Sequence, residues 1–430
     1  MLSQTRVLLL FTLCIFLVSC GGKSKKDLSS KEKGYKYASI KDGVLHLDLD
    51  KSRKDSTRLN LSDICDSLIY IPLETKKELL LSNMLNELCI DGDDLFIHIG
   101  WGVYHFKTDG EFVCQIGKIG RGPGECVCTG ICLNKELKHV YVRANYKNKL
   151  LEYDYDGKLI SERIKLKDRQ REMLYLPAKK SLFYTTSFIL AQRKGITPKY
   201  ITLSEYDLDG KLKYSKLSNY FPNKFFDGGK GIRVVSNGSS KYVLDNSIYF
   251  QEIASDTVFK KEDDSLIPHI ILNNKDFKKA FTSVNLQSLR KICHSYVCND
   301  YFPAIVCGES SRFVFVDSHY EPTYVYDKSD RKLSCVKKYV KHEEDEFGVK
   351  KAKKYMYFND LDGMNHIVST RLVNSEYLYS IVSVADLMEQ LENLKESNNG
   401  KAKYVKQLEK IVGGLTEESN PVFMLARLKK

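Results

Sequence analysis

The sequence predicts an all-β fold, a six-bladed β-propeller. Three copies of one short phrase, an Asp-Gly turn between two short apolar segments, lie at residues 106–112, 153–159 and 206–212. Such a phrase is typical of a β-hairpin. A hairpin unit that recurs about every fifty residues is typical of propeller blades, because one small sheet cannot bury its own faces. The composition agrees: 27 tyrosines and 20 phenylalanines against 9 prolines favour strands.

Short β-prone segments follow one another from Leu68 onward, broken by Asp, Asn and Gly. Segments at 68–73, 88–90, 95–99, 140–142, 150–153, 181–184 and 200–206 accompany the three turns. Weaker hairpins follow at 247–259 and 312–333, and another blade begins at 376–382. At about fifty residues a blade, the 315 residues from Leu68 to Val382 correspond to six blades, with seven as the alternative.

Two stretches have helical spacing instead. Residues 276–290 predict a short inserted helix, and residues 384–412 predict a helical hairpin inserted in the last blade. The chain then returns to a strand at 420–427, which closes the ring by pairing with the start of the repeats. Closure by an N-terminal strand at Val44–Leu49 is the alternative. We therefore expect a lead-in at 37–67 and the propeller at 68–430.

Residues 1–19 predict a signal peptide. Arg6 supplies a positive charge, and Val7–Val18 form an apolar run too short to span a bilayer as a mature helix. The run ends in Ser19-Cys20-Gly21, which resembles a bacterial lipobox in which Cys20 is lipidated and becomes the mature N-terminus. An ordinary signal peptide or a short membrane anchor is the alternative. The polar, lysine-bearing residues 20–36 predict a lipidated, flexible tether.

The net charge is +12, and its lysines are scattered along the chain. Binding of nucleic acid needs a basic stripe with interleaved aromatic residues, so we expect no nucleic-acid partner. A basic surface of this kind is either simply solvated or lies near anionic lipid or acidic glycan.

Twelve cysteines are present, of which Cys14 leaves with the signal peptide. The cluster Cys126, Cys128 and Cys132 has neither the two-residue gaps of common zinc sites nor a nearby histidine pair. We expect no metal site and predict that these cysteines pack in the core as small hydrophobes, with disulfide pairing as the alternative. The same holds for three later cysteines, Cys293, Cys298 and Cys307.

Four segments, together with the lipobox, resemble the six-bladed β-propeller lipoproteins of Bacteroidetes, which are distantly related to NHL-type propellers. They are Tyr70–Thr75, the glycine-rich Ile116–Glu125, Ser255–Phe259 with Pro268 after it, and Asn420–Val422. Cys126 departs from the family, which usually has an aromatic residue there, and Leu361–Asn365 matches only in part. The resemblance implies a fold and a lipid anchor, and it assigns no activity.

The glycine-rich segment lacks the Gly-Lys-Ser/Thr of a phosphate loop and the helix start of a dinucleotide site, because Pro123 follows Gly122. We expect a tight crossing between blades. Arg121 and Glu125 flank its end, where they pair with each other or meet a ligand.

An aromatic site is the other binding candidate. Trp101, the only tryptophan, lies near Tyr104 and His105, and such a group can stack against a sugar ring. Ordinary strand packing is the alternative. No Ser-His-Asp or Cys-His arrangement can be assembled from nine dispersed histidines. Some six-bladed hydrolases hold calcium in the central channel. Calcium is an open alternative here, because the sequence does not assign a set of ligand residues to it.

Two functions follow as hypotheses. The first is a lipid-anchored, non-catalytic binding or scaffold module of the cell envelope, for a glycan, a peptide or an envelope protein. The second is a metal-assisted hydrolase or lyase that acts through the central channel. The basic residues after Cys20 favour the periplasmic face of the outer membrane over the cell surface.

Overall fold

The structure is a computed structural model of the chain. It describes residues 34–82, 85–120, 122, 124–144, 149–165, 172–185, 188–190, 201–217, 233–235, 240–252, 255–275, 305–318, 322–337, 339–344, 350–355, 357–364, 372–397 and 402–430. The chain divides into residues 1–34 and one compact unit, Tyr35–Lys430, which contains the propeller.

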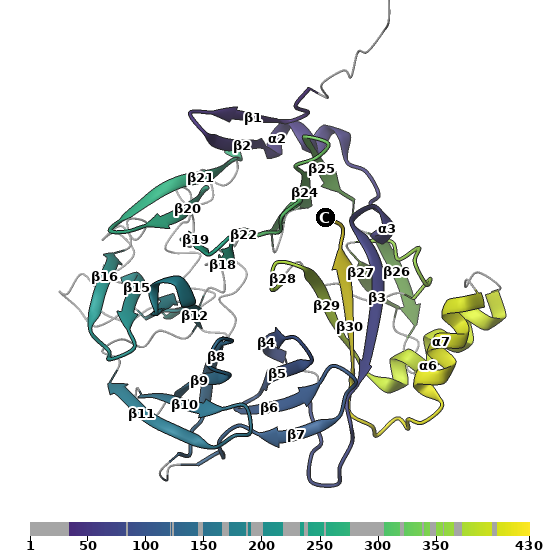
Figure 1. Cartoon of the computed structure of the whole chain (residues 1–430). Coiled ribbons are helices and arrows are strands. Elements are labelled where there is room, and N and C mark those ends of the chain that lie inside the picture. The colour runs from purple at the N-terminus through teal and green to yellow at the C-terminus, as the bar shows by residue number, and fades with distance from the viewer. Residues whose placement is uncertain are drawn as a thin grey trace, which may run out of the picture. The chain divides into compact units, whose positions relative to one another are not determined.

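Six blades, each of four antiparallel strands, stand around a common centre in this unit, as the sequence predicts (Figure 1), and two further strands extend the sheet of blade four. From centre to rim, blade one consists of β4 (Leu85–Asp91), β5 (Asp94–Ile99), β6 (Gly102–Lys107) and β7 (Phe112–Gln115). Blade two consists of β8 (Cys128–Asn134), β9 (His139–Ala144), β10 (Lys149–Asp154) and β11 (Leu159–Lys165). Blade three consists of β12 (Glu172–Leu176), β13 (Ser181–Thr185), β15 (Ile201–Asp207) and β16 (Leu212–Leu217). Blade four consists of β18 (Ser240–Leu244), β19 (Ser247–Gln251), β20 (Thr257–Glu262) and β21 (Ser265–Asn273). Blade five consists of β22 (Ile305–Glu309), β23 (Phe313–Ser318), β24 (Thr323–Asp327) and β25 (Lys332–Val336). Blade six consists of β28 (Leu372–Val373), β29 (Tyr377–Val382), β30 (Val422–Leu428) and β3 (Cys65–Pro72).

The ring closes in blade six, where the C-terminal β30 pairs antiparallel with the N-terminal β3 from Cys65↔Leu428 to Pro72↔Val422. The predicted closure is thus confirmed, and the alternative at Val44–Leu49 is wrong. That segment forms β2 (Val44–Asp48), which runs parallel to β21 and adds to the rim of blade four. The backbone groups of an edge strand accept any extended segment that reaches them, so an isolated strand pattern does not identify its partner.

An N-terminal arm, residues 35–64, covers the rims of two blades. It contains β1 (Ala38–Lys41), β2, α2 (Leu49–Ser52), the 3-10 turn η1 (Arg53–Asp55) and α3 (Leu61–Ile64). β1 pairs with β2 outside blade four, and the bridges Lys36↔Lys332 and Thr57↔Val336 place the arm along β25 of blade five. The arm therefore caps edge strands that would otherwise be free to pair with another chain.

The core lies between the blades. In β5, Leu95 and Ile97 pack toward blade six, whereas Phe96 between them packs toward blade two. Alternate side chains of a strand point to opposite faces of its sheet, and both faces are covered here. This is why the strands of the sequence are apolar at successive positions.

The three Asp-Gly turns join the third and fourth strands of blades one, two and three. Their glycines, Gly110, Gly157 and Gly210, have φ of +97°, +81° and +83°. The carboxylates of Asp154 and Asp207 accept the backbone N–H of the residue four positions later, each at 2.8 Å. These carboxylates brace the Asp-Gly turns of blades two and three, and the repeats mark the outer hairpins of successive blades.

All the inserted elements that the structure describes emerge on one face of the ring. Successive antiparallel strands alternate in direction, so connections between second and third strands, and those between blades, leave from the same end. These connections carry the paired strands β14 (Phe188–Leu190) and β17 (Arg233–Val235), the paired strands β26 (Tyr339–Glu344) and β27 (Lys350–Tyr355), and the helices α6 (Val384–Ser397) and α7 (Ala402–Val412). We call this side the insertion face and the opposite side the turn face; the short η2 (Pro177–Lys179) lies in a β12–β13 turn of the latter.

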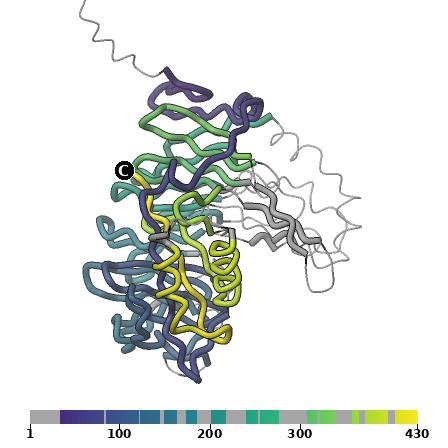
Figure 2. Tube along the Cα trace, turned by 90° about the vertical axis from the view of Figure 1, so that its right-hand side faces the viewer, coloured from purple at the N-terminus to yellow at the C-terminus, as the bar shows by residue number. Residues whose placement is uncertain are grey.

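The predicted helical hairpin is confirmed: α6 and α7 lie between β29 and β30 of blade six. Figure 2 shows the ring from its edge, with these helices in front and the C-terminus on the left of the view. The helix predicted at 276–290 lies outside the described residues. Within the described ranges, no helix has the length and apolar character needed to cross a bilayer.

Candidate binding site on blade one

The structure describes four of the five binding candidates that the sequence suggests and separates them. Trp101 is exposed, Tyr104 is half-buried, His105 is buried and Glu125 is engaged within its own loop. Arg121 and the lipidation candidate Cys20 lie outside the described residues. Of the set, Trp101 alone combines a large aromatic surface with access to solvent.

Two glycines present Trp101. Ile99 pairs with Gly102, so Gly100 and Trp101 form a two-residue turn between β5 and β6 on the insertion face. Gly100 has φ of +59°, which a glycine adopts without strain. A Cβ on Gly102 would lie 2.6 Å from the hydroxyl of Tyr104, so the missing side chain leaves room for that ring. The turn leaves the Trp101 side chain 63% exposed.

Hydrogen bonds from neighbouring residues fix this turn in place. The Asn86 amide Nδ2 donates to the Gly100 carbonyl at 2.8 Å, and the Trp101 carbonyl accepts the N–H of Cys128 at 3.1 Å. The ring Nε2 of His98, which is buried, lies 3.4 Å from the same Asn86 amide. The exposed indole therefore stands on a rigid support rather than on a free loop, which lowers the entropy cost of binding.

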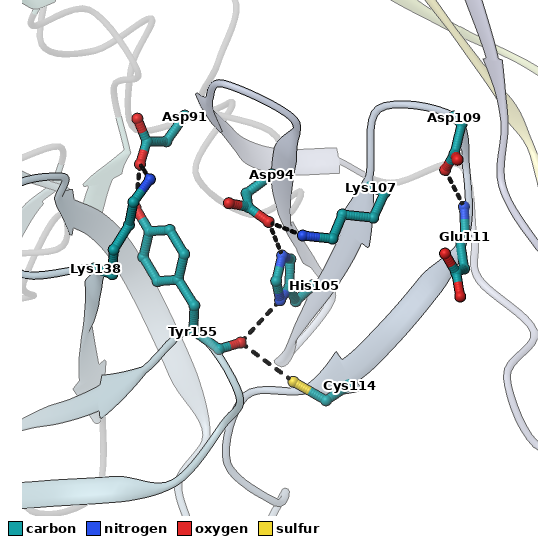
Figure 3. A network of polar contacts seen from close by, with 9 residues as sticks. All are labelled: Asp91, Asp94, His105, Lys107, Asp109, Glu111, Cys114, Lys138 and Tyr155. Carbon is teal, nitrogen blue, oxygen red and sulfur yellow. Dashed lines mark hydrogen bonds and ion pairs between the residues drawn. The ribbon is translucent and has the colours of Figure 1, made fainter.

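His105 takes part in a network of polar contacts instead of joining the site; Figure 3 shows this network. Its Nδ1 lies 2.8 Å from the carbonyl oxygen of Tyr155 in blade two, and its Nε2 lies 2.9 Å from the carboxylate of Asp94. The ring stacks on Phe96 at 4.3 Å between centroids. Lys107 adds an ion pair of 2.6 Å to Asp94. The histidine holds blade one to blade two.

The electrostatics of this network follow from its hydrogen bonds. Burial by itself would raise the pKa of Asp94, but hydrogen bonds from Lys107 and His105 outweigh it and hold that pKa below its usual value. Burial raises the pKa of Tyr155, and its hydrogen bond to Asp91 raises it further. Asp94 is thus held as a carboxylate and Tyr155 as a neutral hydroxyl, as a stable structural contact requires.

The glycine-rich segment links β7 to β8, the crossing between blades one and two that the sequence predicts. The Gly122 N–H donates to the Glu125 carboxylate at 2.8 Å, and the Gly124 N–H donates to the Glu162 carboxylate at 3.0 Å. Tyr153 donates its hydroxyl proton to the Gly124 carbonyl at 2.7 Å. Amides that hold a phosphate in other glycine-rich loops are occupied here by carboxylates of the chain itself.

A turn of blade six crosses the centre of the ring at the turn face. Asn374 and Ser375, at the β28–β29 turn, have φ of +53° and +57°. Asn374 donates its amide to the carbonyl of Ile90 in blade one at 2.9 Å. Ser375 donates its hydroxyl to the carbonyl of Val243 in blade four at 3.0 Å. The sequence reasoning missed this contact, because only the closed ring brings these residues together.

No group of three or more His, Cys, Asp and Glu side chains suited to a metal ion occurs within the described ranges. The eight cysteines described there are free thiols: Cys65, Cys89, Cys114, Cys126, Cys128, Cys132, Cys307 and Cys335. Burial raises the pKa of Cys126 to about 11. The predicted packing of Cys126, Cys128, Cys132 and Cys307 in the core is confirmed, and Cys293 and Cys298 lie outside the described residues.

Two further apolar side chains share the insertion face with Trp101. Leu80, 67% exposed, lies on the connection from blade six to blade one, and Ile119, 50% exposed, lies on the connection from blade one to blade two. The neighbours of Leu80, Leu79 and Leu81, pack in the cluster between blades six and one that Tyr104 also joins. Blade one is therefore flanked by exposed apolar groups, a set that the sequence did not distinguish from core residues.

Comparison with known proteins assigns the family. The family model described as a domain of unknown function, DUF4934, matches residues 44–427. The chain belongs to the DUF4934 family. This member is also similar to the structure of a Bacteroides fragilis protein inferred to be exported, with 18% identity and a TM-score of 0.58 over 87% of this chain and 98% of the other. This likeness confirms the predicted resemblance to Bacteroidetes propellers at the level of the fold.

Other comparisons of the DUF4934 chain are weaker. A member of the duf4221 family from Bacteroides vulgatus has 10% identity and a TM-score of 0.43, over 85% of this chain and 97% of the other. BamB from Moraxella catarrhalis has 10% identity and a TM-score of 0.33, over 68% and 74%. No curated protein matches the chain.

Proposed function

We propose that the chain is a non-catalytic binding module of the cell envelope that holds a glycan, a peptide or an envelope protein on its insertion face. The exposed Trp101 carries this proposal, because a large aromatic side chain on a rigid support is the kind of residue that dominates binding energy. Leu80 and Ile119 extend the apolar surface on either side of blade one. The elements inserted in the other blades rise on the same face and supply further contacts for a partner.

The envelope setting is part of the proposal. The lipobox at Cys20 anchors the mature chain in the outer membrane, and the basic residues that follow favour its periplasmic face. Cys20→Ala should move the protein from the membrane fraction to the soluble fraction of the cell. Protease treatment of intact cells should leave the wild type uncleaved, and cleavage would place it on the outside.

A binding experiment tests the role of Trp101. Purified mature protein is presented to a glycan array and to a solubilised outer-membrane fraction, and the bound species are quantified for wild type and Trp101→Ala. Loss of a central aromatic anchor should weaken binding at least tenfold. The matched control is Leu137→Ala, an apolar side chain that is 58% exposed at the β8–β9 turn of the turn face. Equal loss in both variants, or no specific binding by the wild type, would contradict the proposal.

A further inference from the structure

The N-terminal arm forms part of the ring's rim where the compact unit begins. Its residue Lys36 bridges to Lys332 of β25, donating its N–H to the carbonyl of Arg331 at 2.9 Å. The guanidinium of Arg331 lies over the ring of Tyr35, 5.2 Å from its centroid. We call this surface the N-terminal rim; it comprises Tyr35, Lys36, Ile40, Lys41, Lys54, Arg331 and Lys332.

The N-terminal rim carries both cations and exposed apolar groups. Tyr35 and Ile40 are 40% and 55% exposed. Lys36 is paired with Asp55 at 3.2 Å. Lys41, Lys54 and Lys332 are exposed, and no ion pair ties them to any other residue that the structure describes. Lysines beside a tyrosine and an aliphatic side chain are suited to the boundary of a bilayer, where the ammonium groups meet phosphates and the apolar groups enter the interface.

The stretch between the proposed lipid anchor at Cys20 and the compact unit is short enough for a bilayer to lie near the N-terminal rim. Gly34 lies fourteen positions after Cys20 in the sequence. A flexible chain of that length has an end-to-end distance of about 20 Å, and of about 50 Å when fully extended. If Cys20 carries lipid, as the proposed function holds, then this rim is the part of the propeller that the anchor brings closest to the headgroups.

We propose that the N-terminal rim docks on anionic lipid headgroups, so that the propeller rests on the bilayer through blades four and five. This inference rests on the proposed lipid anchor for its setting, although the rim itself is tested without lipid. Blade four is three blades from blade one in either direction around the ring (Figure 1). Docking through this rim therefore holds the Trp101 site on the side of the ring away from the membrane.

Co-sedimentation with vesicles tests the rim directly. The mature chain with Cys20→Ala is mixed with vesicles of phosphatidylcholine alone or with about 30% phosphatidylglycerol. We expect binding to the anionic vesicles that falls steeply between low and physiological salt, since surface charges are screened. Each lysine near an anionic surface contributes about 1 kcal/mol, so Lys41→Glu, Lys54→Glu and Lys332→Glu together should reduce partitioning by about a hundredfold.

The control removes the same charge elsewhere. Lys158, Lys211 and Lys406 are exposed, have no ion pair with a described residue, and lie on blades two and three and on α7. Their triple change to Glu should reduce binding much less. Equal losses in the two triples would show that only net charge matters, and no binding by the unlipidated wild type would also overturn the inference. Neither outcome bears on Trp101 binding or on fractionation of the Cys20 variant.

A fluorescence measurement separates the rim from the opposite blade. In a Trp101→Phe background, Ile40→Trp places the only tryptophan on the rim, where brominated lipids in the anionic vesicles should quench it. The native chain, whose only tryptophan is Trp101, should show no quenching under the same conditions. Quenching of Trp101 but not of the tryptophan at position 40 would reverse the proposed orientation and overturn it.

Discussion

Gly110 of blade one lies directly against the carbonyl group of Pro72, at the end of β3 in blade six. A Cβ at Gly110 would lie far inside van der Waals contact with that oxygen. The Glu74 N–H donates to the Gly110 carbonyl at 2.8 Å, which fixes the approach. The second repeat shows the same arrangement, since a Cβ on Gly157 would lie 3.0 Å from the carbonyl of Gln115 at the end of β7. In blades one and two the repeated glycine thus serves both the turn and the docking of the blade on the one before it.

The first prediction concerns this contact. Gly110→Ala should lower the free energy of unfolding by about 2–5 kcal/mol, because it combines a left-handed backbone with a clash against a backbone atom. Gly157→Ala should cost less, since its nearest backbone contact is looser. Gly92→Ala is the control, with φ of +58° and open space around its Cβ, and should cost about 1–2 kcal/mol. Urea denaturation measures all three, and an equal loss for Gly110 and Gly92 would refute the role of the contact.

The repeats show how much of the fold could be predicted from the sequence. The Asp-Gly motifs predicted the outer hairpins, because a turn depends on residues that are adjacent in the sequence. The C-terminal strand predicted the ring closure, because the last blade of a closed ring must pair with the start of the chain's repeats. The partner of Val44–Leu49 was not predictable, since its residues meet β21 more than 200 positions later. Trp101 and His105 are only four residues apart, but Trp101 lies in the turn at Gly100 and is exposed, whereas His105 lies within β6 and is buried.

A second prediction concerns Asn420, which joins two of the segments that carry the family resemblance. This side chain is 1% exposed. Its Oδ1 accepts the N–H of Leu81, and its Nδ2 donates to the carbonyls of Glu74 and Leu79, each at 2.8 Å. Asn420→Ala leaves these buried groups unsatisfied and should cost about 3–5 kcal/mol.

Its control is Asn393→Ala on the exposed side of α6, where the amide donates to the carbonyl of Glu389 and has no other hydrogen bond to a residue that the structure describes. That change should stay within about 0.5 kcal/mol. Thermal unfolding followed by circular dichroism compares the two variants. Similar melting temperatures would show that Asn420 does not tie blade six to blade one.

A third prediction concerns the thiols. The thiolate is the reactive form of cysteine, and burial raises the pKa of Cys65 to about 12 and that of Cys114 to about 11. In a mature chain with Cys20→Ala, Cys293→Ser and Cys298→Ser, the remaining eight thiols should react with a maleimide at pH 7 far more slowly in the native state than in urea. Rapid native labelling of any of the eight, or a disulfide between two of them, would contradict the packing seen here.

The last prediction is the response to acid. The pKa of Asp94 lies below its usual value, although burial opposes this, because Lys107 and His105 donate to the carboxylate. A carboxyl group with a lowered pKa in the folded state contributes stability above its unfolded value of about 3.9, and this contribution is lost as the pH falls through the folded pKa. The same holds for Glu309. Burial by itself would raise its pKa, but hydrogen bonds from His269 and Lys328 outweigh this effect and lower the pKa.

Unfolding free energy should therefore decrease as the pH is lowered from about 5 toward 2, and Asp94→Asn should flatten part of this slope. At pH 7 the same variant should be less stable by about 1–3 kcal/mol, the usual effect of removing hydrogen bonds to a charged group. Asp93→Asn, at the exposed neighbouring position, should keep the wild-type slope. Urea titrations at several pH values measure the slopes, and identical curves for Asp94→Asn and wild type would show that Asp94 does not lock blade one to blade two through its charge.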